Sequence, residues 1–90
     1  MSPGRRPTCV LHNASVRVTF DAEVNLAYIS LLDRKGRVGE AVRQVSVAEP
    51  GGSPARIVLD LDRDGRLIGI EVFDARETLP VELLDQAHAP

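Results

Sequence analysis

The stretch from Arg56 to Phe73 consists of two runs rich in Ile, Val and Leu, separated by Asp62-Arg63-Asp64-Gly65. Residues of this kind favour strands, aspartate favours the first position of a tight turn, and glycine readily adopts the left-handed backbone conformation. The stretch therefore predicts a β-hairpin with strands over residues 56–61 and 66–73. No other segment limits the fold as strongly.

The length of the turn predicts a register for this hairpin. A three-residue loop at 63–65 pairs Asp62 with Arg66, Asp60 with Ile68 and Ile57 with Glu71. Because side chains alternate along a strand, Glu71 would then face away from Asp60 and Asp62. Both faces of the hairpin would be apolar: one would carry Ile57, Leu59, Leu61, Leu67 and Phe73, and the other Val58, Ile68, Ile70 and Val72.

The rest of the chain adds strands before the hairpin and helix after it. Period-2 alternation over residues 16–20, an apolar run over 26–32 and a Val-rich segment over 38–48 predict three further strands, and the last of them is more exposed. Two prolines and two glycines make residues 49–54 a loop. Asp74 and Glu77 have the spacing of a capping box, and Pro80 predicts a second short helix that ends near residue 87.

These elements predict a mainly β domain of the small α+β kind. We expect an antiparallel meander of about five strands with a short C-terminal helix. Residues 1–14 form an N-terminal tail in this interpretation, residues 15–79 the β domain, and residues 80–90 the helix and a tail. A folded part of about 65 residues lies near the lower limit for a self-sufficient core.

Charge and cysteine content narrow the classes of partner. The net charge is −2, so the sequence has no basic pattern for nucleic acid or for an anionic membrane surface. No apolar run reaches transmembrane length. Cys9 is the only cysteine, which excludes an internal disulfide and fits a reducing cytosol. We expect a cytoplasmic protein without nucleic-acid or membrane partners.

Two segments carry a resemblance to a known family. The segment 20–29, FDAEVNLAYI, resembles the family's opening "YDPEADALYI", and residues 60–72 with Asp74 and Ala75 resemble its close, "DxDxDGxLxGIEI…DA". The chain is thus similar, over residues 16–79, to the bacterial family called domain of unknown function 2283. It departs from the pattern at Asn25, in the Pro/Gly insertion at 49–54 and in its leader. The resemblance implies a compact β domain of the bacterial cytosol with no assigned activity and no catalytic residues.

Asp60, Asp62, Asp64, Gly65 and Glu71 match the calcium loop of EF-hands, D-x-D-x-D-G followed by five residues and Glu. The flanking residues favour strands, whereas an EF-hand needs a helix on each side. The predicted register also separates Glu71 from the aspartates. We interpret the aspartates as turn-forming residues, with a weak calcium site from Asp60, Asp62 and Asp64 alone as the alternative.

Residues that could support catalysis are scattered. His12 and His88 lie in opposite tails without Cys, Asp or Glu at ligand spacing, so we expect them to be solvated. We interpret Asp21 and Glu23 as turn residues. Ser30 lies outside any G-x-S-x-G motif, the nucleophile elbow that would support nucleophilic catalysis. Tyr28 is expected to pack in the sheet with its hydroxyl at the rim. The sequence predicts no cofactor and a non-enzymatic protein.

The apolar pattern on both hairpin faces suggests an interaction role. A single sheet of this size covers one face with its own helix and leaves part of the other exposed. The leading hypothesis is a homodimer, through stacked sheets or paired edge strands, or binding to a small protein partner, as an accessory or antitoxin-like member of a bacterial operon. The alternative is a calcium- or ligand-binding module that uses the Asp60/Asp62/Asp64 turn.

Overall fold

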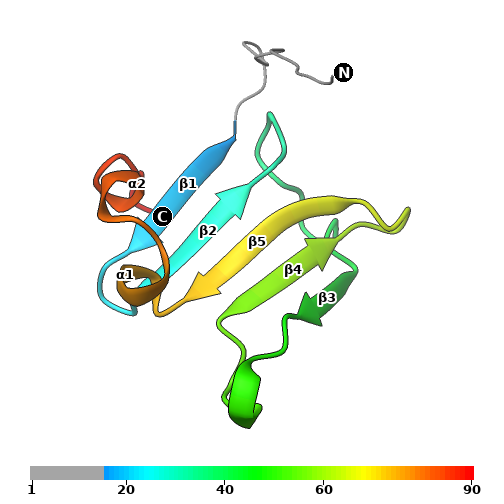
Figure 1. The fold of residues 1–90 in the computed structure, drawn as a ribbon. Coiled ribbons are helices and arrows are strands. Elements are labelled where there is room, and N and C mark those ends of the chain that lie inside the picture. Colours follow the sequence, from blue (N-terminus) through cyan, green and yellow to red (C-terminus); the bar gives the residue numbers. More distant parts are fainter. Residues whose placement is uncertain (1–15) are drawn as a thin grey trace, which may run out of the picture.

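A computed structural model describes residues 16–90, and the predicted tail at 1–14, with Cys9 and His12, lies outside these residues. The described part is a five-stranded antiparallel sheet with two short helices near its C-terminal end (Figure 1). The mainly β, α+β fold class is confirmed. The strands are β1 (Arg17–Asp21), β2 (Leu26–Ser30), β3 (Arg43–Ser46), β4 (Ile57–Leu61) and β5 (Leu67–Phe73).

The strand order is β1-β2-β5-β4-β3. A meander is present in two pieces, the β1–β2 hairpin and the β3–β4–β5 run, but β2 pairs with β5 and not with β3. The long 31–42 connection therefore crosses the sheet, which makes the arrangement a Greek key. This pairing places β5 at the centre of the sheet, with β1 and β3 at its edges.

The third strand is much shorter than the 38–48 segment predicted, because only Arg43–Ser46 pairs with β4. Residues 31–42 instead form an irregular loop. Within it, the Arg34 guanidinium is paired with the Glu40 carboxylate at 2.5 Å, and the Arg37 N–H donates to the same carboxylate. This pairing holds the pKa of Glu40 down at about 2.

The β4–β5 turn has the predicted three-residue loop. The Asp62 N–H donates to the Arg66 carbonyl, and Gly65 takes a φ of 80°. Beyond the turn the predicted register is wrong, because a β-bulge shifts it by one residue: Asp60 pairs with Gly69 and Val58 with Glu71. A bulge places two residues opposite one, here Leu67 and Ile68 opposite Leu61.

The shifted register separates the two faces of the sheet by polarity, so the prediction that both hairpin faces are apolar is also wrong. Directly paired residues share a face. One face therefore carries Val18, Phe20, Ala27, Ile29, Val45, Ile57, Leu59, Leu61, Ile70 and Val72, with Arg43 as its charged residue, whereas the other carries Arg17, Thr19, Asp21, Leu26, Tyr28, Ser30, Gln44, Ser46, Val58, Asp60, Glu71 and Phe73. We call these the apolar face and the polar face.

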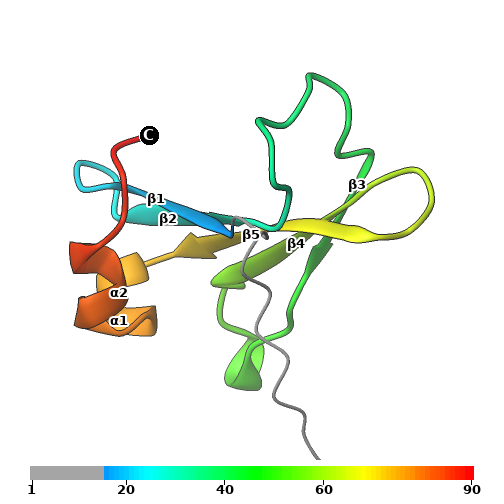
Figure 2. The same ribbon diagram turned by 90° about the horizontal axis from the view of Figure 1, so that it is seen from above.

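The helices α1 (Ala75–Thr78) and α2 (Val81–Asp85) pack on the apolar face at the end of β1, β2 and β5 (Figure 2). Ala75 joins Ala27 and Val72 in the buried cluster, and Leu79 and Leu84 pack against it. None of the described helices is long and apolar enough to cross a membrane.

The predicted capping box at Asp74 is wrong. Asp74 takes a left-handed conformation with φ 53° and makes no side-chain cap hydrogen bond. Asn25, in the β1–β2 turn, caps α1 instead: its side-chain oxygen accepts the Arg76 N–H at 2.9 Å, its backbone carbonyl accepts the Ala75 N–H, and its amide group donates to Glu77. The first turn of the helix is thereby tied to a distant hairpin.

Candidate functional site

The apolar face is covered over only one half. Near the helices, Ala27 and Ala75 are fully buried, and Val72 is the only large side chain of residues 16–90 that is fully buried. The other half, formed by β4 and β3, has no helix over it. Val45, Leu59 and Leu61 are only partly buried there. We call this region the bare half.

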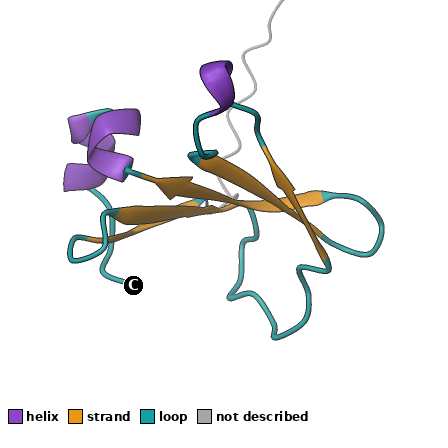
Figure 3. Ribbon diagram, turned by 90° about the horizontal axis from the view of Figure 1, so that it is seen from below, coloured by secondary structure: helices purple, strands orange, loops and turns teal. Residues whose placement is uncertain are grey.

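Two helical segments project from the same side of the sheet. Figure 3 shows the α1–α2 pair at one end of the sheet and, on the same side, the short helix η2 (Pro50–Gly52), which lies within the predicted 49–54 loop. The 31–42 loop projects from the opposite side in the same view. The bare half therefore lies on the side of the sheet from which both helical segments project.

The polar face contains one buried carboxylate. Asp60 is 6% exposed and accepts hydrogen bonds from the Tyr28 hydroxyl at 2.9 Å and from the Gln44 side-chain amide at 3.0 Å. The Tyr28 ring crosses β5 above Gly69, where any side chain would overlap it. This network joins β2, β4 and β3 across the central strand, and both Asp60 oxygens have a partner in it.

The same network changes the acidity of Tyr28. Burial, the hydrogen bond to Asp60 and the negative charges of Asp60 and Glu71 raise the pKa of Tyr28 to about 12. The phenol therefore stays neutral at physiological pH and serves as a hydrogen-bond donor. The expectation of a packed tyrosine with its hydroxyl at the rim is wrong for the hydroxyl, which donates to a buried carboxylate.

The predicted calcium residues do not form a common site in the structure. Asp62 accepts the Asp64 and Arg66 N–H groups with its side chain, at 2.9 and 3.0 Å, which is the behaviour of a turn-forming aspartate. Asp60 is held in the Tyr28 network. Within residues 16–90 no group of three or more His, Cys, Asp or Glu side chains is placed to hold a metal ion.

Glu71 lies on the same face as Asp60. Because of the bulge, Glu71 pairs with Val58 and so shares the polar face with Asp60, contrary to the predicted register. Asp60 and Asp62 are engaged in hydrogen bonds within the protein, and it is these bonds, not the alternation of side chains, that speak against a shared calcium site. Calcium binding by Asp60, Asp62 and Asp64 stays a prediction.

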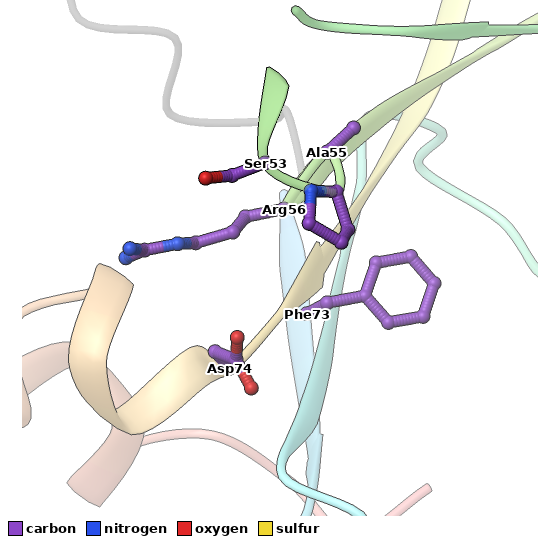
Figure 4. A pocket seen from close by; sticks show the side chains of 6 residues that line it. Ser53, Ala55, Arg56, Phe73 and Asp74 are labelled. Carbon is purple, nitrogen blue, oxygen red and sulfur yellow. The ribbon is translucent and has the colours of Figure 1, made fainter. Parts of the chain in front are cut away.

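A pocket of about 480 Å³ lies where the loop before β4 meets the start of α1. Figure 4 shows the Arg56 side chain extending past Ser53 on the side of α1, and the Phe73 ring turned to the other side. The pocket is lined by the guanidinium group of Arg56, the carboxylate of Asp74 and the aromatic ring of Phe73, among others. Such a mixture defines no single ligand chemistry.

The sheet and the polarity of its two faces define the class: a small antiparallel β domain with one partly covered apolar face. The family model for DUF2283, a protein of unknown function, matches residues 17–76, and the chain belongs to this family. The resemblance seen in the sequence is thereby confirmed. No curated protein and no solved structure matches the chain.

Proposed function

We propose that this protein is a non-enzymatic interaction module of the bacterial cytosol that forms a homodimer through its apolar face. The observation that carries the proposal is the bare half beside a very small core. Val72 is the only large side chain that is fully buried in residues 16–90. Covering Val45, Leu59 and Leu61 would supply the apolar burial that such a core lacks.

The occupant that we propose is a second copy, placed by two-fold symmetry. The helices cover one half of the face and leave the other half bare, so a two-fold rotation would place α2 of each copy on the bare half of its partner. Val81, at the start of α2, is 65% exposed and would be the apolar contact.

The charges near the two halves are complementary. Residues 75–85, which contain the helices, carry three carboxylates, Glu77, Glu82 and Asp85, and one arginine. On the bare half Arg43 pairs with Leu61 and thus lies on the apolar face. A two-fold dimer would bring Arg43 of one copy near the acidic α2 of the other, which favours this orientation.

Sedimentation of the full chain over a range of concentrations tests the dimer. We expect a mass of twice 9.8 kDa. Val45→Asp should make the chain monomeric while its circular dichroism stays that of a sheet, because the change places a charge in the contact. Val24→Asp is the matched control: Val24 is 64% exposed in the β1–β2 turn, away from this face, so the dimer should persist.

A charge exchange tests the orientation. Arg43→Glu should weaken association because two acidic groups would then face each other, and mixing it with a chain that carries Glu82→Arg and Asp85→Arg should restore it. A wild-type chain that stays monomeric at every concentration contradicts the proposal. A folded Val45→Asp chain that still dimerises excludes this face and leaves pairing of the β3 edge as the mode of association.

A further inference from the structure

A second pocket, of about 220 Å³, lies on the polar face over β1 and β2, away from the proposed dimer contact. Its lining comes from three segments that are distant in sequence: the two strands, the 31–42 loop and the C-terminal residues after α2. Besides Gly36, it is lined by Arg17, Thr19, Tyr28, Ser30, Lys35 and His88.

The strands provide the floor of the pocket. Arg17 pairs with Ser30 and Thr19 pairs with Tyr28, so these four side chains are neighbours on one face. The Tyr28 hydroxyl donates to Asp60, which leaves the ring as an apolar surface. The Ser30 hydroxyl oxygen accepts the Leu32 N–H, so its proton is free to donate to a ligand.

The other two segments are held in place by hydrogen bonds. The N–H of His88 donates to the Val18 carbonyl at 2.9 Å, and its carbonyl accepts the Phe20 N–H at 2.8 Å. This bridge extends the β1 edge and fixes His88, which the sequence had suggested to be merely solvated. The Arg34–Glu40 pair closes the loop that carries Lys35.

The charge of this pocket is opposite to that of the whole chain. Its lining within residues 16–90 contains Arg17, Lys35 and His88 and no carboxylate, although the net charge of the protein is −2. The carboxylates of Asp60, Glu71 and Glu40 are close enough to Tyr28 to raise its pKa, but none of them lines the pocket, and Asp60 accepts hydrogen bonds from Tyr28 and Gln44. Guanidinium, ammonium and hydroxyl donors are the groups that bind oxyanions.

We propose that this pocket binds a small organic oxyanion, a phosphate ester or carboxylate. Its charged group would lie against Arg17, Lys35 and His88 and its apolar part on the Tyr28 ring. The volume is below that of pockets for drug-sized ligands, roughly 300–1,000 Å³, which limits the ligand to a small metabolite. The site faces away from the dimer contact, so it can be filled in a monomer or a dimer.

Tyr28 is the only tyrosine and there is no tryptophan, so the intrinsic fluorescence of the full chain reports directly on the floor of the pocket. We would titrate phenyl phosphate and benzoate at constant ionic strength, with inorganic phosphate as the ligand without an apolar part. We expect a saturable fluorescence change with at least one aromatic anion and weaker binding of inorganic phosphate. Stronger binding of phenyl phosphate or of benzoate identifies the anionic group.

The variant Lys35→Ala should weaken binding about tenfold, the loss expected for one charge-assisted hydrogen bond. Arg63→Ala is the matched control, since Arg63 is exposed in the β4–β5 turn outside the pocket. Because Lys35 is exposed in a loop, its replacement should leave the melting temperature unchanged. The absence of any saturable change, or an equal loss in Arg63→Ala, would overturn the proposal.

Discussion

The two halves of the sheet differ in how they are stabilised. Near β1, β2 and β5, two short helices bury Ala27, Val72 and Ala75. Near β3 and β4, the same face carries comparable residues with no helix over them, and they stay partly exposed. The residue types are similar in the two halves. The difference in burial therefore comes from the helices, which the topology places over one half only. A chain built in this way has its fully buried residues in one half of the sheet and leaves apolar residues partly exposed in the other.

The largest effect that tests this contrast is expected from valine truncations. Val72→Ala should lower the free energy of unfolding by about 2–3 kcal/mol, because it removes buried methyl groups and leaves a cavity. Val45→Ala in the bare half should cost less than about 1 kcal/mol in dilute, monomeric solution. Urea denaturation of both variants measures the difference. Equal losses would show that the two halves are packed alike.

The next effect concerns the network that links the halves. Tyr28→Phe keeps the ring above Gly69 but removes the donor to buried Asp60, so it should cost about 1–3 kcal/mol. Urea denaturation at neutral pH measures this loss. The matched variant Gln44→Ala removes the other donor to Asp60, from a more exposed position, and should cost less. Losses in the reverse order would contradict the assignment of Tyr28 as the main link.

The raised pKa of Tyr28 gives this network a pH dependence. The pKa of the phenol rises from about 10 in the unfolded chain to about 12 in the folded one. Folding therefore favours the protonated form: the stabilisation is complete below pH 10 and is lost as the pH rises to about 12. Ultraviolet absorbance of the single tyrosinate follows the titration directly. A midpoint near 10 in the folded protein would contradict the buried hydrogen bond.

A smaller effect is expected where the helices are attached to the packed half. Asn25→Ala removes the side-chain cap of α1 and should cost about 1 kcal/mol, with an added penalty because the φ of residue 25 is 56°. Asn25→Gly separates the two contributions, since glycine accepts this φ without a cap. Thermal unfolding by circular dichroism measures both. A lower melting temperature for Asn25→Gly than for Asn25→Ala would show that the backbone conformation of residue 25 is not strained.

The smallest effect is expected from calcium at the turn beyond the bare half. If Asp60, Asp62 and Asp64 bind calcium, the melting temperature should rise on addition of calcium and the rise should vanish in Asp62→Ala. The hydrogen bonds of Asp60 and Asp62 lead us to expect no change. A calcium-dependent rise that is lost in Asp62→Ala would restore the metal hypothesis.

Local patterns predicted the elements of this fold well. The three-residue turn, four of the strands, the helical segments after Asp74 and the membership in the DUF2283 family follow from residues close together in sequence, whereas the short helix η2 within the predicted 49–54 loop was not predicted. The signals are the spacing of apolar residues and the turn chemistry of Asp and Gly, which act over a few residues. They do not require knowledge of which strand lies beside which.

Contacts between residues that are distant in sequence could not be predicted in this way. Pairing of β2 with β5, capping of α1 by Asn25 and placement of His88 beside Val18 join residues that no local pattern connects.

The bulge opposite Leu61 had the largest consequence for the site. An apolar run such as 67–73 fits either register equally well, and only the room needed by the Tyr28 ring above Gly69 and the burial of Ile70 and Val72 under the helices favour the observed one. Local residue patterns are thus enough to predict a β domain with an acidic turn. Its division into one polar face and one half-covered apolar face depends on the strand pairing, because a single inserted residue exchanges the faces of a strand.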